Sequence, residues 1–213
     1  MISVSMDAIF RMAEQVKGFL DPEEGQRLYD VAYQASPLGP CLEIGSYCGK
    51  SALFLGWACK ARQGTLFSID HHNGSEEQQP GEQYFDPELF SPGLYAVDTF
   101  PHFRRTLHMA GLEDTVVPVV AESAVAARAW QTPLSLVFID GGHAFETVLK
   151  DFQSWSPHIL TGGYLMIHDI FPNPADGGQA PYQVYQAAVR SGYFEARPTT
   201  GTLGVLKKVR KTL

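Results

Sequence analysis

Residues 40–51, Pro-Cys-Leu-Glu-Ile-Gly-Ser-Tyr-Cys-Gly-Lys-Ser, constrain the fold of this chain most strongly. A short apolar run carries Glu43 two residues before Gly45, and Gly49 follows four positions later. A helical pattern then opens at residues 51–60. A strand, a glycine turn and a helix in this order place backbone N–H groups and a helix N-terminus against a ligand. The acid beside the turn would repel a pyrophosphate and would favour a hydroxylated or cationic ligand.

The spacing of this segment argues against two common phosphate-binding motifs. A Walker P-loop needs four residues between its glycines, and only three separate Gly45 from Gly49. The dinucleotide fingerprint G-x-G-x-x-G also fails, because Tyr47 stands where its second glycine belongs. The pattern that remains is E-x-G-x-x-x-G.

The rest of the chain alternates strand-like and helix-like segments. We expect strands at residues 41–45, 65–70, 115–120, 134–140, 163–168, 193–197 and 202–208. Helices are expected at 5–18, 22–35, 50–61, 97–110, 122–129, 144–154 and 180–190. This alternation predicts an α/β fold with a doubly wound, mostly parallel sheet and right-handed crossovers. The turn between the last two strands is too short for a helix, so these strands should pair antiparallel.

The chain length and composition favour a single domain. With 213 residues and 45% apolar content, the chain can bury one good core, so we expect one domain over residues 1–213. Residues 1–38 should form an N-terminal helical cap. Residues 71–94, rich in Gly, Pro, Glu, Gln and Asn, could be a disordered linker, but we expect a substrate-covering insertion, because they follow a strand at the ligand-binding edge of the sheet. The insertion has an acidic face formed by Glu76, Glu77, Glu82, Asp86 and Glu88.

The charge and the termini indicate which partners to expect. A formal net charge of −7 and a pI near 5.4 argue against a general nucleic-acid or membrane-surface binder. The three cysteines show no C-x-x-C spacing, which favours buried thiols over a disulfide or a zinc site. No signal peptide or membrane-spanning run is apparent. We therefore expect a cytoplasmic protein with a small-molecule partner, and leave open a homo-oligomer in which the N-terminal helices cover a partner's cleft.

A second acid marks the neighbouring strand. Asp70 ends the run 65–70 and lies 25 residues beyond Gly45, close to the spacing at which such folds place a carboxylate on ribose hydroxyls. The alternative is an ordinary surface acid in a turn. His71 follows directly and could contact the same ligand, although loop histidines are more often simply solvated.

Two later strand ends carry acids and histidines. Asp140 ends the apolar run 134–139 and is followed by two glycines and His143, while His168 and Asp169 end the next strand. Parallel neighbouring strands finish at one sheet edge, so Asp140, His168 and Asp169 should converge there and could hold a divalent cation. His143 is a candidate general base, because imidazole accepts a proton near neutrality. The alternative for His143 is a helix cap.

The combined motifs resemble those of a known family. E-x-G-x-x-x-G resembles motif I of the class I S-adenosylmethionine-dependent methyltransferases, and Asp140, His143 and Asp169 match the small metal-assisted O-methyltransferases that act on sugars in antibiotic biosynthesis. The resemblance implies a seven-stranded sheet of order 3-2-1-4-5-7-6 with an antiparallel last strand. It also implies methylation of a small-molecule hydroxyl. It makes S-adenosylmethionine the cofactor, contacted by Glu43, Gly45, Ser46, Tyr47, Gly49, Ser51, Asp70, His71, Glu122, Ser123 and Asp140.

Some positions allow more than one interpretation. Glu122 and Ser123, expected beside the adenine, could equally begin the helix 122–129. His168 stands where the sugar O-methyltransferases usually carry a carboxylate. This makes manganese more plausible than magnesium and leaves open a site without a metal. Two other functions compete: a metal-dependent hydrolase using the same acids and histidines, and a non-catalytic protein that only binds the cofactor. The methyl acceptor cannot be read from the sequence.

Overall fold

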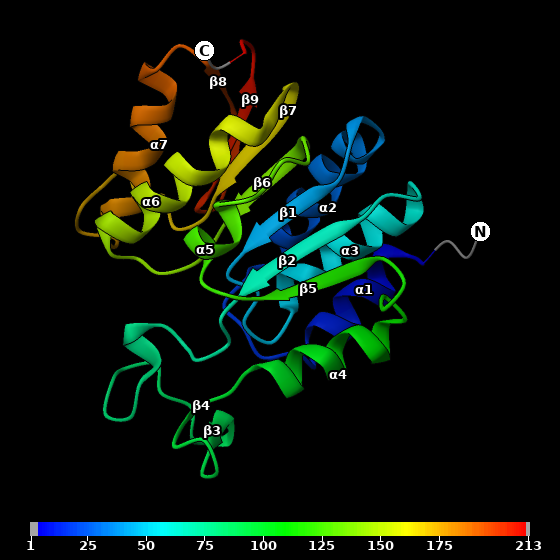
Figure 1. Ribbon diagram of the computed structural model, residues 1–213, viewed down its shortest axis with the longest axis vertical. Coiled ribbons are helices and arrows are strands. Elements are labelled where there is room, and N and C mark those ends of the chain that lie inside the picture. Colours follow the sequence, from blue (N-terminus) through cyan, green and yellow to red (C-terminus); the bar gives the residue numbers. More distant parts are fainter. Residues whose placement is uncertain (1–3, 212–213) are drawn as a thin grey trace.

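The computed structural model describes residues 4–211, which contain a seven-stranded sheet between two layers of helices (Figure 1). The sheet is built from β1 (Cys41–Ile44), β2 (Leu66–Asp70), β5 (Val116–Val120), β6 (Leu134–Ile139), β7 (Ile159–Ile167), β8 (Phe194–Thr200) and β9 (Leu203–Lys208). Their order is β5-β2-β1-β6-β7-β9-β8, and β9 runs antiparallel to both of its neighbours. Counted along the chain, this is the order 3-2-1-4-5-7-6, so the predicted fold is confirmed.

The helices separate by position in the chain. One layer holds α1 (Met6–Ala13), α2 (Pro22–Ala35), α3 (Lys50–Ala61) and α4 (Phe100–Ala110). The other layer holds α5 (Ser123–Ala127), α6 (Phe145–Trp155) and α7 (Ala180–Arg190). Short 3-10 turns are η1 (Ser36–Leu38), η2 (Glu76–Gln78), η3 (Pro87–Leu89) and η4 (Ser156–His158). No helix within residues 4–211 is long and apolar enough to cross a bilayer.

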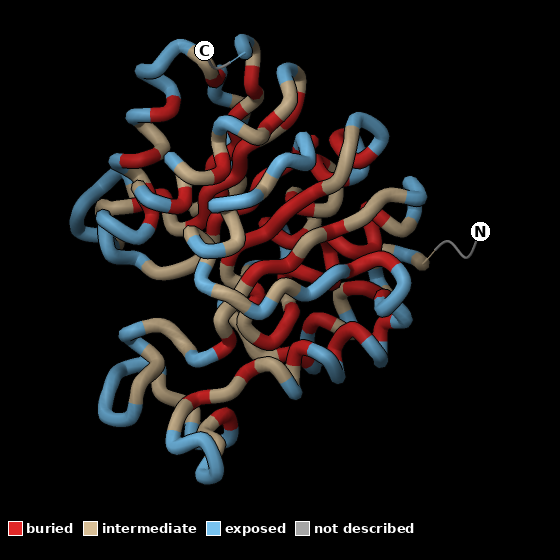
Figure 2. Tube along the Cα trace, in the orientation of Figure 1, coloured by how far each residue is buried: buried red, intermediate tan, exposed pale blue. Residues whose placement is uncertain are grey.

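The central strand β6 shows why the core lies on both faces of the sheet. All six of its residues are buried, as its nearly unbroken apolar run predicted, and the one polar residue, Ser135, donates to the carbonyl of Gly39. Phe138 belongs to the core under the α1–α4 layer, and its neighbours Val137 and Ile139 belong to the core under α5–α7. Side chains alternate along a strand, so a strand covered on both faces is apolar at most positions. Burial is accordingly continuous along the middle strands in Figure 2.

Two prolines lie in strands, and both strands are outermost. Pro118 is in β5 and Pro198 is in β8, at opposite edges of the sheet. A proline cannot donate a backbone hydrogen bond and is tolerated where one side of a strand has no neighbour. The strand predicted at 193–197 was too short, because β8 continues through Pro198 to Thr200.

Of the two N-terminal helices, one has the predicted range and the other is shorter than predicted. α2 covers residues 22–35 as expected, with Asp21 as N-cap, a reciprocal capping box to Glu24 and proline at the first turn. The first helix was predicted over 5–18 but ends at Ala13. The residues that follow contact other elements instead, since Lys50 Nζ donates to the carbonyl of Gly18 at 2.8 Å.

The insertion is more ordered than its composition suggested. Besides η2 and η3, it contains β3 (Phe90–Ser91), which pairs antiparallel with β4 (Ala96–Val97) just beyond the predicted end of the insertion. Lys17 anchors it to the N-terminal segment through ion pairs with Asp86 and Glu88. In Figure 1 it extends away from the sheet on the side where β2 ends.

Candidate active site

The glycine loop after β1 touches the neighbouring strand end. Gly45 has φ +89°, and a Cβ built there would lie 2.1 Å from the carbonyl oxygen of Asp140, so only glycine allows this approach. Gly49, with φ +93°, precedes α3, whose N-terminus has no side-chain cap. The loop thus offers an uncapped helix N-terminus, which attracts polar or anionic groups.

Asp70 connects this loop to the start of the insertion. Its Oδ2 accepts a hydrogen bond from the backbone N–H of Tyr47 at 2.8 Å, and its Oδ1 accepts one from that of His72 at 2.7 Å. Each carboxylate oxygen has capacity for a second donor, so the half-buried acid can still accept from ribose hydroxyls. His71 Nδ1 accepts from the backbone N–H of Asn73 at 3.0 Å.

Glu43 lies beneath the loop, not beside it. The side chain is fully buried, and its two oxygens accept hydrogen bonds from Ser68 at 2.5 Å and Ser51 at 2.8 Å. Burial raises the pKa of Glu43 to about 7, against the opposing effect of the two serines. The carboxyl group therefore ties β1 to β2 and α3, and this use of Ser51 was not foreseen. Direct cofactor contact by Glu43 or Ser51 stays a prediction.

The residues predicted beside the adenine lie at the N-terminus of α5. Glu122 is exposed and is the N-cap residue, without a side-chain cap bond. The Ser123 hydroxyl accepts a hydrogen bond from Trp155 Nε1 at 2.8 Å. Ser123 thus fastens α5 to α6, and an adenine contact by either residue stays a prediction.

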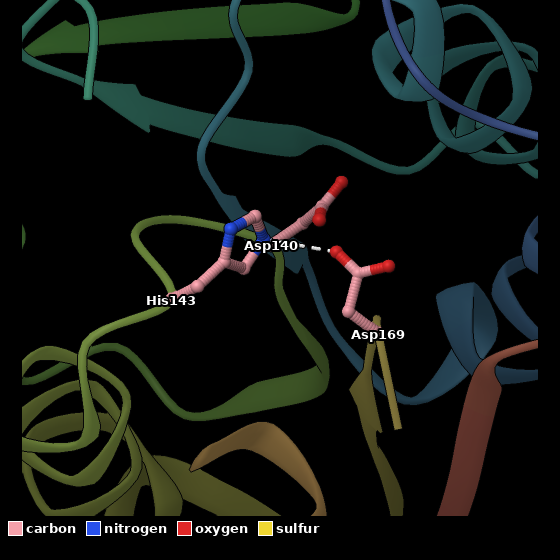
Figure 3. A group of neighbouring side chains, drawn as sticks. All are labelled: Asp140, His143 and Asp169. Atoms are coloured by element: carbon pink, nitrogen blue, oxygen red, sulfur yellow. Dashed lines mark ion pairs between the residues drawn. The ribbon is translucent and has the colours of Figure 1, made fainter. Parts of the chain in front are cut away.

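Asp140, His143 and Asp169 form a cluster at the sheet edge. Each offers a ligand atom, and these atoms all lie within 4.8 Å of one another. Figure 3 shows the three side chains pointing toward one another, and His143 Nε2 lies 2.9 Å from Asp169 Oδ2. Asp169 has φ +56°, uncommon for a residue other than glycine, and such backbone strain occurs often at functional sites. His143 does not cap α6, because the N-cap residue is Ala144.

Glu77 completes the surroundings of His143. This residue of η2 places Oε2 at 3.1 Å from His143 Nδ1, so both ring nitrogens face carboxylates. The hydrogen bond to Asp169, with a smaller effect of Glu77, raises the pKa of His143 to about 9. The sequence showed Glu77 only as one of several acids in the insertion, and nothing in it indicated this partner.

His168 lies behind the cluster, buried between two acids. Its Nε2 is 2.9 Å from Glu24 Oε2 and its Nδ1 is 3.1 Å from Asp140 Oδ1, with Asp169 Oδ2 at 3.5 Å. Burial alone would lower the pKa of His168, but Asp140, Asp169 and Glu24 outweigh it and raise the pKa strongly. The structure therefore groups His143, and not His168, with the two acids as potential ligands.

Glu24 was missed by the sequence analysis. Its Oε1 accepts hydrogen bonds from the backbone N–H of Thr202 at 2.7 Å and the Thr202 hydroxyl at 2.9 Å. The first-turn acid of α2 therefore links the N-terminal cap, the β8–β9 hairpin and His168. The capping box of α2 was the one available signal, but it gives no indication of a partner 144 residues away.

A family profile described as a methyltransferase domain matches residues 42–170, which include β1, β2, β6, β7 and the acid–histidine cluster. The chain belongs to this methyltransferase family. It is a class I S-adenosylmethionine-dependent methyltransferase, and the predicted family is confirmed.

Solved structures share the fold of this methyltransferase at low sequence identity. The O-methyltransferase NovP has a TM-score of 0.67 and 15% identity, over 89% of this chain and 81% of that one. TomG from Streptomyces achromogenes, an O-methyltransferase of tomaymycin synthesis solved with SAM, has a TM-score of 0.63 and 14% identity, over 96% of this chain and 89% of that one. An O-methyltransferase from Bacillus cereus, in complex with SAH, has a TM-score of 0.63 and 15% identity, over 95% of this chain and 90% of that one.

One buried group in the methyltransferase loop has no partner. The Ser46 hydroxyl is 2% exposed and makes no hydrogen bond within residues 4–211. Buried hydroxyls are normally satisfied, so an orphan here is suited to a polar ligand atom. Together with the uncapped N-terminus of α3 and the spare acceptor capacity of Asp70, it fits S-adenosylmethionine.

Proposed function

We propose that this methyltransferase methylates a hydroxyl group of a small molecule, assisted by a divalent cation and by His143 as proton acceptor. The supporting observation is the position of the Asp140–His143–Asp169 cluster beside the glycine loop. The backbone of Gly45 approaches the carbonyl of Asp140 so closely that no side chain fits between them. Groups that hold a methyl donor on that loop would therefore place it next to groups that can hold and deprotonate an acceptor.

The cofactor half of the site provides positioning. When bound, S-adenosylmethionine supplies an electrophilic methyl carbon on its sulfonium. Asp70 would hold the ribose hydroxyls, the loop from Gly45 to Gly49 would enclose the cofactor, and the Ser46 hydroxyl would meet a polar atom of it. Methyl transfer depends on the acceptor oxygen being held in line with the methyl carbon, so a rigid loop contributes directly to the rate.

The donor set of the cluster suits a divalent cation. Two carboxylates suit divalent ions such as magnesium or manganese, and His143 beside them stays available to accept a proton. When bound, such an ion makes a hydroxyl that it contacts more acidic. Asp140 and Asp169 would supply oxygen ligands, while His168 would hold Asp140 from behind.

His143 needs a free nitrogen to accept a proton. With a pKa of about 9, set mainly by Asp169, the imidazole is largely protonated near neutral pH. A cation on Asp169 would compete with the ring for that carboxylate and lower the pKa. His143 would then take the acceptor's proton while the acceptor oxygen bonds to the methyl carbon and the carbon–sulfur bond breaks.

The choice of oxygen as the acceptor atom draws on related proteins. NovP, TomG and the Bacillus cereus protein are each described as O-methyltransferases, and this chain shares their fold. The acidic insertion beside the cluster is also suited to a neutral or cationic polyhydroxylated acceptor.

Transfer of labelled methyl groups tests the proposal directly. Radiolabelled S-adenosylmethionine would be incubated with a panel of catechols, phenols and sugars, with and without added Mn²⁺ after EDTA treatment. We expect label on a hydroxyl oxygen and loss of most turnover after EDTA, restored by Mn²⁺. Label found only on nitrogen or carboxylate acceptors would contradict O-methylation. Turnover insensitive to EDTA would contradict the role of the cation.

A further inference from the structure

The ring of His143 is held at both ends by groups from distant parts of the chain. Nε2 faces Asp169 at the end of β7, and Nδ1 faces Glu77, which lies 66 residues earlier in the insertion. The backbone that carries His143 follows Gly141 and Gly142, and its side chain is 40% exposed. Local packing therefore restrains the ring little, and its orientation depends on these two carboxylates.

The turn that carries Glu77 is itself strongly hydrogen bonded. Ser75 and Gln78 form a reciprocal capping box around η2. The side-chain nitrogen of Gln79 donates to the carbonyls of Asn73, Gly74 and Ser75, at 3.1, 3.3 and 2.9 Å. The carbonyl of Glu77 accepts a hydrogen bond from the backbone N–H of Tyr84 at 3.0 Å. An exposed acid on a turn fixed in this way has a defined position.

Neighbouring acids of the insertion behave differently. Asp86 and Glu88 are paired with Lys17. Glu76, next to Glu77 in the same turn, is exposed and makes no side-chain hydrogen bond or ion pair within residues 4–211. Among these acids, Glu77 is the one directed at His143.

We propose that Glu77 is a positioning residue, which holds Nδ1–H of His143 so that Nε2 is directed at Asp169 and the acceptor side of the cluster. This inference rests on the proposed function of His143. The hydrogen bond made by one ring nitrogen decides which nitrogen remains available for a proton or a cation. The insertion would thereby supply a part of the catalytic cluster through Glu77.

The chemistry requires this orientation whether or not a cation participates. If Nε2 accepts the acceptor's proton, Nδ1 must carry the other one, and a carboxylate stabilises the imidazolium that results. If Nε2 binds a cation, Nδ1–H needs an acceptor behind it, the usual arrangement for a metal-ligating histidine. In both cases the Glu77 carboxylate can accept the hydrogen bond from Nδ1–H of His143.

Three variants of the full chain test this role. Glu77→Ala removes the acceptor, Glu77→Gln keeps an oxygen that can accept from Nδ1–H, and Glu76→Ala is the matched control from the same turn. The first measurement is a proton–nitrogen spectrum of the ¹⁵N-histidine-labelled protein near neutral pH. We expect a slowly exchanging Nδ1–H signal of His143 in the wild type, Glu76→Ala and Glu77→Gln, and its loss in Glu77→Ala.

The second measurement is methyl transfer at saturating S-adenosylmethionine and Mn²⁺. Glu77→Ala should lower turnover roughly 10- to 100-fold, the usual effect of removing a group that orients a functional histidine. Glu77→Gln should recover most of that loss, while S-adenosylhomocysteine binding should stay the same in all three variants. A loss of turnover in Glu76→Ala equal to that in Glu77→Ala would overturn the proposal.

The spectrum separates this inference from the proposed function. If the wild type methylates no hydroxyl and binds no Mn²⁺, the proposed function fails, but an Nδ1–H signal that depends on Glu77 still supports the positioning role. If the signal is absent in the wild type, or persists in Glu77→Ala, the positioning role is wrong even in an active methyltransferase.

Discussion

The two histidines at the sheet edge are held in similar ways but in different surroundings. His168 lies between Glu24 and Asp140 with 5% of its side chain exposed. His143 lies between Asp169 and Glu77 with 40% exposed. Glu24 comes from the first turn of α2 in the N-terminal cap, and Glu77 comes from the insertion. In the proposed function, the buried pair supports the framework of the fold and the exposed pair takes part in the chemistry.

This difference in exposure predicts which pair stabilises the fold and which leaves a side chain accessible to substrate. A buried ion pair fixes geometry, and removing one partner leaves an uncompensated charge. An exposed pair adds little to stability because water screens it, but it leaves the ring accessible to a substrate. Variants of the two pairs should therefore have opposite effects on folding and on turnover.

The largest effect should follow from His143→Ala. Loss of a general base lowers turnover by about 10²- to 10⁴-fold, while the free energy of unfolding should change by less than about 1 kcal/mol for this exposed pair. Methyl transfer and urea denaturation measure the two quantities. His108→Ala is the matched control, because His108 is an exposed histidine paired with Glu113 at 3.0 Å. If His143→Ala loses stability and keeps its turnover, the distinction between the two histidine pairs is wrong.

Glu24→Ala should have the reverse effect. Removing the Glu24 carboxylate leaves the buried Nε2–H of His168 and the backbone N–H of Thr202 without their acceptor, which should lower the free energy of unfolding by about 3–5 kcal/mol. Glu23→Ala, in the same helical turn but exposed, should stay within about 0.5 kcal/mol of the wild type. Equal losses in the two variants would show that the Glu24–His168 pair has no special role.

Glu43 extends the contrast to a buried acid without a cationic partner. Its pKa in the folded protein, about 7, is higher than the ordinary 4.5, so the native state binds more protons than the unfolded state between these pH values. Its contribution to stability is therefore greatest below pH 4.5 and falls by about 3 kcal/mol as pH rises to 7.

Replacement of Glu43 by glutamine removes this dependence of stability on pH. The free energy of unfolding of Glu43→Gln, relative to the wild type, should rise by about 3 kcal/mol between pH 4.5 and 7 in the absence of cofactor. Denaturation at several pH values gives the difference curve, with Glu23→Gln as control. A flat difference curve would mean that Glu43 is ionised throughout that range.

The smallest effect is expected at Lys17, which anchors the insertion. Its pairs with Asp86 and Glu88 are partly exposed to solvent, so Lys17→Ala should cost less than about 1 kcal/mol, and the loss should shrink in high salt. Lys60→Ala, which breaks a comparable pair with Asp114, is the control. A loss of several kcal/mol would show that the insertion is part of the folding core.

The sequence predicted the fold well because its local signals agree with one another. The apolar run of β6, the glycine turn after β1 and the capping box of α2 each specify an element through short-range interactions. The first helix was predicted too long because apolar spacing alone does not show that Lys17 and Gly18 contact the insertion and α3. Such contacts between distant segments leave no local pattern.

The same limit applies to the site. Asp140 and Asp169 could be predicted to converge, since neighbouring parallel strands end at the same edge, but the histidine predicted to join them was His168 and not His143. The partners Glu24 and Glu77 could not, because each lies in a segment whose position is set by tertiary packing. His168 was predicted as a metal ligand from its place beside Asp169, but only the side-chain geometry shows that Glu24 holds it on the buried side.

Binding of S-adenosylhomocysteine, measured by calorimetry in the wild type and in Asp70→Ala, tests the central claim most directly. A carboxylate bonded to ribose hydroxyls contributes about 1.5–3 kcal/mol, so the variant should bind roughly 10- to 100-fold more weakly while remaining folded. Equal affinity in the two proteins, or no binding by the wild type, would contradict the cofactor site at this edge of the sheet.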